Sequence, residues 1–334
     1  MSSDQEPLAV AQARIEQFAS RVRTIRASLH EVIVGQDDAL DQLLICALTG
    51  SHALLVGVPG LAKTLMVKAL ASAFHWKYAR IQFTPDLMPS DITGYELLGR
   101  AADGAPEMAF RPGPVFANLV LADEINRAAP KTQSALLESI AEQHVTVGGK
   151  TYDLEAPFLV VATQNPIEQE GTYPLPEAQL DRFMMEIRIA YPSPEQEEEI
   201  VMKTTAGALP LPEAALERES FLQLRDLVFA VPLPPNVAAY AVHLCGASRP
   251  EDTRATALAR DYIAWGAGPR GSQNLVLAAK ARALLVGHAA PTVDDIRAVA
   301  LPILRHRLIV NHRAVGDSIT AEQVIDGLLR DIAA

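Results

Sequence analysis

Apolar residues recur at roughly helical spacing in the first part of the chain. Between residues 8 and 30 these positions are Val10, Ile15, Phe18, Val22, Ile25 and Leu29. Side chains that return every three or four residues lie on one face of an α-helix. The spacing predicts a helix over residues 8–30 that precedes the main fold, and a second helix from Asp37 to Leu48.

The pattern then changes to short, continuous apolar runs that alternate with helical stretches. The runs are residues 53–56, 118–122 and 158–162, and the helical stretches between them are 65–74 and 131–142. Continuous apolar runs of this length are typical of strands buried on both faces. Strands that alternate with helices predict crossover connections and a parallel sheet, and therefore an α/β fold.

Two segments look like insertions into this pattern. Short apolar pieces in residues 94–114 flank Asp103-Gly104, a pair that suits a hairpin turn. Residues 144–154 carry Gly148-Gly149 between two short β-like segments, and glycine supplies the positive φ angles that a tight turn needs. We expect a β-hairpin at each place.

The run Tyr191-Pro192-Ser193-Pro194 marks a boundary, because prolines stop both helices and central strands. Helical spacing dominates beyond it, over residues 195–206, 221–229, 235–245 and 273–286. Thr292 with Asp295 resembles a helix start, Thr292 being the N-cap. The predicted organisation is an N-terminal helical segment (1–30), an α/β core (31–192) and a smaller all-α domain (193–334).

Composition excludes several classes of protein. The 334 residues carry 29 Lys and Arg against 40 Asp and Glu, a net charge of −11, which argues against a general nucleic-acid binder. Only two cysteines occur, Cys46 and Cys245, so a disulfide framework is not expected and a reducing compartment fits. The start is polar, and the most apolar stretch, residues 43–58, is interrupted. We therefore expect a cytoplasmic protein with no membrane span.

The first chemical motif is Gly57-Val58-Pro59-Gly60-Leu61-Ala62-Lys63-Thr64, which follows a buried strand and opens a helix. Backbone N–H groups in such a loop can surround an anion, and the helix N-terminus adds partial positive charge. Lys63 would reach the β- and γ-phosphates of ATP, and Thr64 would hold Mg²⁺. The general pattern has glycine before the lysine. Because alanine disfavours left-handed angles, we expect Ala62 to be right-handed. The alternative is a glycine-rich turn without a ligand.

Asp123-Glu124 ends a buried strand, and ligands of parallel α/β sheets bind at that edge. Asp123 would hold Mg²⁺ through water, and Glu124 would polarise the attacking water. A solvent-facing pair of acids is the alternative, which the phosphate loop disfavours. Asn165, after the third strand, could orient the same water, or it could simply form a turn before Pro166.

Two arginines and one basic cluster complete the candidates. Arg182 precedes the domain boundary and Arg270 begins a helix of the second domain; arginine stabilises the charge of a transferring phosphoryl group. Either could also be an ordinary surface residue. The cluster of Arg305, His306 and Arg307 with His312 and Arg313 is expected to be a solvated helix face or to pair with nearby acids, without a catalytic role.

Together these motifs resemble the MoxR family of AAA+ ATPases, from about Val32 to about Leu308. The segments that match are the phosphate loop, Leu121 to Ala128 followed by Pro130-Lys131-Thr132-Gln133, and Ala162-Thr163-Gln164-Asn165-Pro166. Alanine before the lysine is usual in that family. Gly268 departs from the family's usual serine before Pro269, which puts only local rigidity in doubt.

The resemblance implies an AAA+ fold with a parallel-sheet core and a helical lid, and it assigns roles. Asn165 would be the first sensor, Arg182 an arginine finger acting on a neighbouring subunit, and Arg270 a second sensor that reports the γ-phosphate from the lid. The expected catalytic residues are Lys63, Glu124, Asn165, Arg182 and Arg270, and the expected Mg²⁺ ligands are Thr64 and Asp123. The residues expected at ATP are Val34, Gly35, Gln36, Gly57, Val58, Pro59, Gly60, Leu61, Ala62, Lys63, Thr64, Leu65 and Arg270.

The resemblance further implies a homo-oligomeric ring, commonly a hexamer, and chaperone-like remodelling or maturation of protein clients, often proteins with von Willebrand factor A domains. Alternatives are a nucleotide-dependent scaffold with little turnover, a nucleic-acid motor, and a magnesium-chelatase-like ATPase subunit. Glu124 and Arg182 disfavour the scaffold, net charge disfavours the motor, and the residues around Asp123 favour the MoxR family over the chelatase.

Overall fold

A computed structural model describes residues 8–100, 106–167, 171–205, 207 and 210–333 of the chain. Its centre is a five-stranded parallel sheet with the strand order β2-β5-β8-β1-β9. The strands are β1 (His52–Val56), β2 (Tyr78–Gln82), β5 (Leu119–Asp123), β8 (Leu159–Gln164) and β9 (Phe183–Arg188). The prediction of a parallel α/β sheet is confirmed, and the three predicted strands are the three central ones.

Both faces of the sheet are buried. Alternate residues of each central strand point to opposite faces and so enter two different hydrophobic cores. Leu54 and Val120 face α5 in one core, whereas their neighbours Leu55 and Leu121 face the other core, with α2 and α3. Since successive side chains of a strand point to opposite faces, both must be apolar when helices cover both faces. This is why the central strands appear in the sequence as continuous apolar runs.

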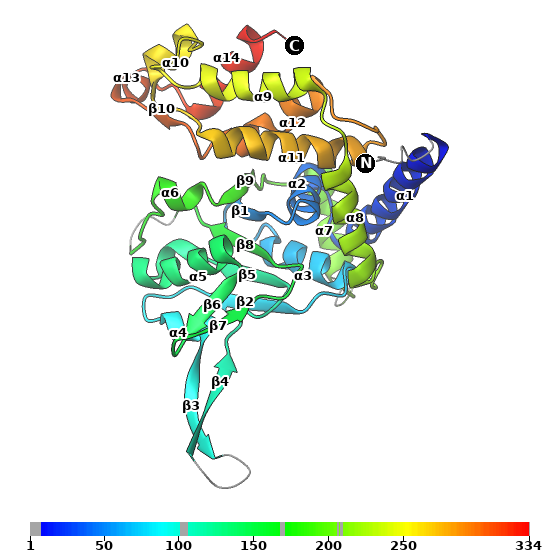
Figure 1. The fold of residues 1–334 in the computed structure, drawn as a ribbon, viewed down its shortest axis with the longest axis vertical. Coiled ribbons are helices and arrows are strands. Elements are labelled where there is room, and N and C mark those ends of the chain that lie inside the picture. The colour runs from blue at the N-terminus through cyan, green and yellow to red at the C-terminus, as the bar shows by residue number, and fades with distance from the viewer. Residues whose placement is uncertain (1–7, 101–105, 168–170, 206, 208–209, 334) are drawn as a thin grey trace, which may run out of the picture.

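The helices of the first part of the chain largely agree with the predicted spans. They are α1 (Leu8–Val32), α2 (Asp37–Leu48), α3 (Lys63–Ala73), α4 (Pro89–Thr93), α5 (Pro130–Glu142) and α6 (Glu177–Leu180), with a 3-10 turn η1 (Ile125–Arg127). In Figure 1, α1 lies outside the sheet layer, and it packs against α3 and against α11 of the lid.

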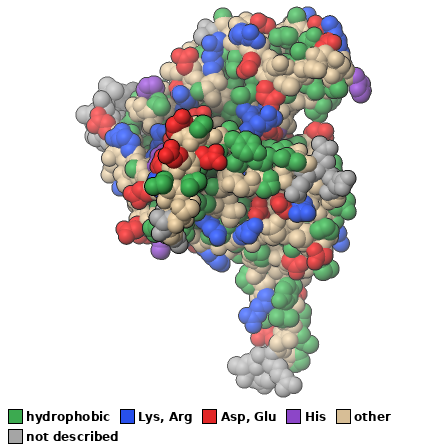
Figure 2. Space-filling model, turned by 180° about the vertical axis from the view of Figure 1, so that it is seen from behind, with side chains coloured by type: hydrophobic (Ala, Val, Ile, Leu, Met, Phe, Trp, Pro, Cys, Tyr) green, Lys and Arg blue, Asp and Glu red, His purple; other side chains and the backbone are tan. Residues whose placement is uncertain are grey.

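Both predicted hairpins are present. β3 (Gly94–Arg100) pairs with β4 (Pro106–Pro112), and β6 (His144–Val147) with β7 (Lys150–Asp153), both antiparallel. Gly148 and Gly149 have φ of 59° and 79°, as the turn requires, whereas the predicted Asp103-Gly104 turn lies outside the described residues. The β3–β4 hairpin projects far from the body (Figure 1), and Figure 2 shows apolar side chains along this projection. Its exposed apolar residues are Tyr95, Leu97, Leu98 and Met108.

The last part of the chain is helical, as predicted, with one addition. Its helices are α7 (Pro194–Thr205), α8 (Arg218–Ala230), α9 (Pro235–Ala247), α10 (Ala257–Tyr262), α11 (Pro269–Leu285), α12 (Val293–Leu304), α13 (His312–Gly316) and α14 (Ala321–Asp331). The addition is a small antiparallel pair, β10 (Ile263–Trp265) with β11 (Ile309–Val310). Thr292 caps α12 in a capping box with Asp295, as the sequence indicated. The domain boundaries at residues 30 and 192 stay a prediction.

The lid packs on the edge of the sheet that β9 forms. α12 contacts β9, and α11 contacts α2 and α8 (Figure 1). Among the described residues, no single helix is long and apolar enough to cross a membrane. The pair α8 and α9, bent by 87°, passes that test by length and composition only, as packed helices of a protein core also can.

Candidate functional site

The loop between β1 and α3 has the conformation of an anion cradle. Gly60 has φ of 88°, and Ala62 is left-handed, with φ 55° and ψ 20°. The expectation of a right-handed Ala62 is therefore wrong. A single left-handed residue costs only about 1–2 kcal/mol, which the surrounding loop can impose on a side chain as small as alanine. Alternating left- and right-handed residues turn successive N–H groups towards one centre.

A cavity of about 420 Å³ lies over this loop, and its walls join segments far apart in the sequence. It is lined by Pro59, Gly60, Leu61, Ala62, Lys63, Thr64, Leu65, Asp123, Glu124, Thr163 and Asn165. The Lys63 ammonium donates to the carbonyls of Gly57 and, at 3.3 Å, of Val58. The structure thus brings the phosphate loop, the acidic pair and the first sensor to one place, while their roles remain predictions.

The two acids are fixed by a residue that the sequence reasoning did not single out. The hydroxyl of Thr163, which is buried, donates to Asp123 Oδ1 at 2.6 Å and accepts the Glu124 N–H at 2.8 Å. Thr163 belongs to β8, whose carboxyl end lies beside that of β5. Its position directly before Gln164-Asn165 was the available signal, but only the sheet register shows that its hydroxyl meets both acids.

Cationic and amide side chains also bind the same two carboxylates. Arg80 of the edge strand β2 contacts Asp123 Oδ2 through Nη2 at 2.6 Å and Nε at 3.1 Å. Gln82 Nε2 donates to Glu124 Oε2 at 3.0 Å, and Arg127 Nη1 lies 2.9 Å from the same oxygen. A Mg²⁺ ion at Asp123 would compete with Arg80, since both bind the carboxylate. These three partners were not predicted from the sequence.

Asn165 makes the turn contact that one interpretation expected, while its role in orienting water stays a prediction. Its Oδ1 accepts the N–H of Ile167 at 3.1 Å, which is the turn contact expected before a proline. It is also largely buried and lines the cavity over the phosphate loop. A turn residue at the end of β8 can therefore still face a γ-phosphate.

A second cavity, of about 250 Å³, adjoins the first and is mostly apolar. It is lined by Val32, Ile33, Val34, Gln36, Gly60, Leu61, Ala62, Leu65, Pro192, Ile200, Lys203 and Thr204. Of the residues expected at ATP, Val34 and Gln36 line this cavity, while Gly35 lines neither cavity. The contribution of α7 was not predicted, because nothing in its helical spacing shows which part of the core it meets. A shared wall of loop residues makes the two cavities suitable for the base and the phosphates of one nucleotide.

The two arginines lie elsewhere. Arg182 and Arg270 line a cavity of about 720 Å³ together with His52, the first residue of β1. The phosphate loop follows the last residue of β1, at the carboxyl ends of the parallel strands. The two arginines therefore lie at the amino ends of the strands, on the opposite side of the sheet. Arg270 therefore does not line the nucleotide site of its own subunit, contrary to its place among the expected ATP contacts. Its role at ATP stays a prediction.

The surroundings of these arginines bear on two smaller expectations. His306 and Arg307 are buried and do not form a solvated helix face, whereas the alternative, pairing with nearby acids, holds for Arg307 with Asp181 and for Arg313 with Asp261. A Cβ at Gly268 would meet no atom within 4 Å, so the family's usual serine would fit here as well.

Comparisons with known proteins agree with this geometry. The family model described as "ATPase family associated with various cellular activities (AAA)" matches residues 52–185, and that of the AAA lid domain matches residues 255–328. A crystal structure from Cytophaga hutchinsonii ATCC 33406, provisionally assigned there as an ATPase, superposes with a TM-score of 0.90. It is 40% identical and covers 98% of both chains. Core, lid and phosphate site together define an AAA+ ATPase.

Named relatives narrow the class. The chain is 42% identical over 323 residues to Chaperone MoxR1 of Mycobacterium tuberculosis (strain ATCC 25618 / H37Rv), an alignment that covers 95% of this chain and 84% of that protein. It is 34% identical to Protein MoxR of Paracoccus denitrificans, over 90% of this chain and 91% of that protein. The chain belongs to the MoxR family of AAA+ ATPases.

Proposed function

We propose that this protein is a Mg²⁺-dependent ATPase that hydrolyses ATP at the interfaces of a subunit ring and uses the energy to remodel protein partners. The observation that supports this most directly is the division of the candidate site. The phosphate loop and the acids lie at the carboxyl ends of the parallel strands, and both candidate arginines lie at the amino ends. Two copies in head-to-tail contact would complete one site, and repeated head-to-tail contacts form a ring when the rotation between neighbours closes.

Each group of the phosphate site has a role that its chemistry suits. The loop N–H groups and Lys63 would bind the β- and γ-phosphates, and Thr64 and Asp123 would hold Mg²⁺, which neutralises phosphate charge when bound. The loop conformation, the ammonium over the loop and the adjacent carboxylate fit this metal-nucleotide pair. Glu124 would accept a proton from the attacking water, and Asn165 would orient that water.

The arginines would complete the site from the neighbouring subunit. A guanidinium that reaches the transferring phosphoryl group in trans is worth about 10³–10⁵ in rate in comparable systems. An isolated subunit should therefore bind ATP yet hydrolyse it very slowly. Specific ATPase activity measured with mass across a dilution series tests this, and full activity of the monomer would contradict the ring mechanism.

The Glu124→Gln variant tests the chemical step separately. It should keep ATP binding and lose turnover, because glutamine cannot accept the proton. Unimpaired turnover would refute the role of Glu124. Very slow turnover of the wild-type ring at every concentration would instead support the nucleotide-dependent scaffold.

The same variant can identify clients. A ring held with ATP should retain partners that turnover releases, so a pull-down with Glu124→Gln should enrich specific proteins over the wild type. We expect proteins with von Willebrand factor A domains among them, and a mass of the ATP-bound assembly near that of a hexamer. Recovery of the same proteins with and without ATP would argue against a remodelling cycle.

A further inference from the structure

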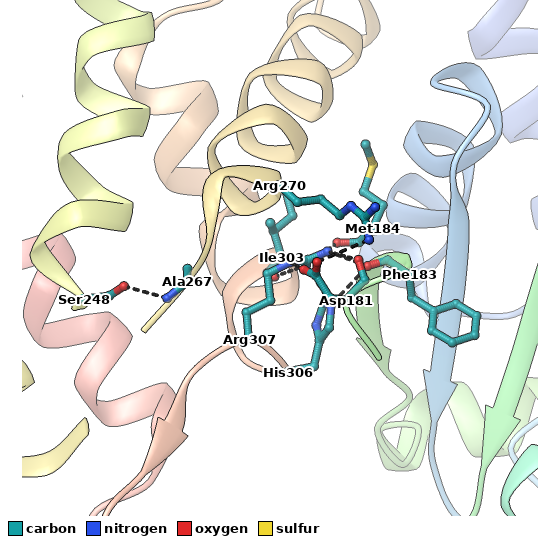
Figure 3. Close-up of polar contacts among 9 residues, drawn as sticks. All are labelled: Asp181, Phe183, Met184, Ser248, Ala267, Arg270, Ile303, His306 and Arg307. Carbon is teal, nitrogen blue, oxygen red and sulfur yellow. Dashed lines mark hydrogen bonds and ion pairs between the residues drawn. The ribbon is translucent and has the colours of Figure 1, made fainter. Parts of the chain in front are cut away.

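The side chain of Arg307, a lid residue, contacts the segment that carries Arg182, the candidate arginine finger. It follows α12, and its side chain is only 2% exposed. Its guanidinium donates to the Ile303 carbonyl of α12 and to three backbone carbonyls outside the lid: Asp181 at 3.1 Å, Phe183 at 2.7 Å and Met184 at 3.0 Å (Figure 3). These carbonyls lie on both sides of Arg182, so one lid side chain fixes the backbone around it.

The charge of Arg307 is balanced by the residue directly before Arg182. Arg307 Nε lies 2.8 Å from Asp181 Oδ1, and the other carboxylate oxygen lies 3.3 Å from Arg270 Nη1 (Figure 3). Burial lowers the pKa of Arg307 and the Asp181 carboxylate opposes this. Arginine remains charged in proteins, so Asp181 joins two cationic lid residues to the segment of Arg182.

Burial and the charge of Arg307 lower the pKa of the neighbouring His306 well below its usual value, so its imidazole adds no positive charge here. The loop before Arg270 is fixed as well, since the Ala267 N–H donates to the buried Ser248 hydroxyl at 3.0 Å. Arg270 and Arg307 of the lid thus both contact Asp181, the residue that precedes Arg182.

We propose that Arg307 is a positioning residue: it sets the placement of Arg182 and Arg270, and thereby makes the action of the arginine finger depend on the position of the lid. The argument rests on the proposed hydrolysis in trans. Arg307 itself is buried away from the cavity that Arg182 and Arg270 line, so it has no direct contact with ATP in this role.

The test compares Arg307→Met with Arg297→Met. Arg297 is a residue of α12, the helix that Arg307 follows, and its hydrogen bonds to Tyr240, Leu329 and Ile332 all stay within the lid. We expect Arg307→Met to keep the ATP affinity of the wild type and to lower kcat by about 10- to 100-fold, the loss typical of a misplaced reacting group. Arg297→Met should keep kcat, even if it lowers thermal stability. Arg307→Lys, which keeps the charge beside Asp181, serves if the methionine variant does not fold.

Mixed rings distinguish a positioning role from a merely structural one. Arg307→Met keeps Glu124, and Glu124→Gln keeps an intact finger, so mixing the two impaired proteins should restore sites between unlike subunits. We expect the mixture to turn over ATP faster than either protein alone. Mixing Arg182→Ala with Glu124→Gln is the control for hydrolysis in trans.

The outcomes separate the two proposals. If the Arg182→Ala control mixture stays inactive, hydrolysis in trans is contradicted and Arg307 loses its proposed role with it. If the control recovers activity and the Arg307→Met mixture does not, Arg307 acts within its own subunit and the positioning role is overturned. Wild-type kcat of the folded Arg307→Met or Arg307→Lys protein would overturn it as well.

Discussion

Ala62 shows how a loop can impose an unfavourable conformation on one residue. Its φ of 55° is left-handed, a conformation in which the alanine Cβ carries a steric cost that glycine would not have. We expect Ala62→Gly to raise the free energy of unfolding by up to about 1 kcal/mol and to keep ATP binding. Urea unfolding and a fluorescent-nucleotide titration measure both.

The matched control is Ala298→Gly, in the exposed interior of α12, which should lower the free energy of unfolding by about 1 kcal/mol. Equal losses for the two variants would show that the left-handed angle at position 62 carries no cost.

His52 predicts a pH dependence of stability. It is buried at the start of β1, where Nδ1 accepts the Val160 N–H at 2.9 Å, and burial lowers its pKa from 6.5 to about 4. Above pH 6.5 the imidazole is neutral in both states, so the full stability is present. Between pH 6.5 and about pH 4, His52 binds a proton in the unfolded chain but stays neutral in the folded chain. The free energy of unfolding therefore falls as the pH is lowered across that window.

The effect of His52 should be on the order of 3 kcal/mol by pH 4. His306 acts in the same direction, so the measurement is the difference between wild type and His52→Asn, followed by thermal unfolding from pH 7 to pH 4. A wild-type pH slope in the variant would show that His52 is not responsible.

At the scale of elements, the starts of helices could be predicted from a few neighbouring residues of the sequence. Thr292 Oγ1 accepts the Asp295 N–H at 3.3 Å, and Asp295 Oδ2 accepts the Thr292 N–H at 2.8 Å. Asp295 is also buried and pairs with Arg282. The sequence indicated the cap, but the ion pair needed α11 to lie beside α12.

We therefore expect unequal costs at this cap. Thr292→Ala should lower the free energy of unfolding by about 1 kcal/mol, the usual cost of a lost cap. Asp295→Ala should cost about 2–3 kcal/mol, because it removes both the cap and a charge-assisted hydrogen bond from Arg282, whose side chain is still 34% exposed. Thr320→Ala, at the similar but exposed cap of α14, is the control in chemical unfolding. Equal costs at positions 292 and 295 would contradict this role of the ion pair.

The edge strands show where sequence patterns stop being informative. β2 has one buried residue, Ile81, and it supplies Arg80 and Gln82 to the acidic pair. Since an edge strand need not be apolar on both faces, its sequence lacks the continuous run that predicted β1, β5 and β8. β9, the other edge, is covered by the lid.

At the scale of the whole molecule, Arg182 and Arg270 lie at the amino ends of the parallel strands and the phosphate loop lies at the carboxyl ends. This separation predicts how substitution of either arginine affects ATP binding and hydrolysis. Arg182→Ala and Arg270→Ala should each leave ATP affinity unchanged in dilute, monomeric protein, because neither side chain lines the phosphate cavity of its own chain. Each should lower ring ATPase activity, by about 10³-fold or more for Arg182.

A fluorescent-nucleotide titration of the monomer, with Lys63→Ala as the positive control for lost affinity, measures the first part. Weaker binding by the monomeric Arg270→Ala protein would place this residue at its own subunit's nucleotide. The proposed sensor in trans would then be wrong.

The sequence by itself determined the parallel α/β core, the helical lid, the phosphate loop and the acids that follow it. These features depend on local patterns, namely buried runs, caps, glycine turns and motif residues, which the chain carries wherever it folds. Only the tertiary structure decided that Thr163, Arg80 and Gln82 meet the acids, that α7 closes the base cavity, and that Arg307 fixes the segment around Arg182. It also decided that Arg270 does not line the cavity over the phosphate loop of its own chain. Those relations join residues tens to more than a hundred positions apart. They are set by strand order, register and lid packing, which no spacing within a single segment encodes.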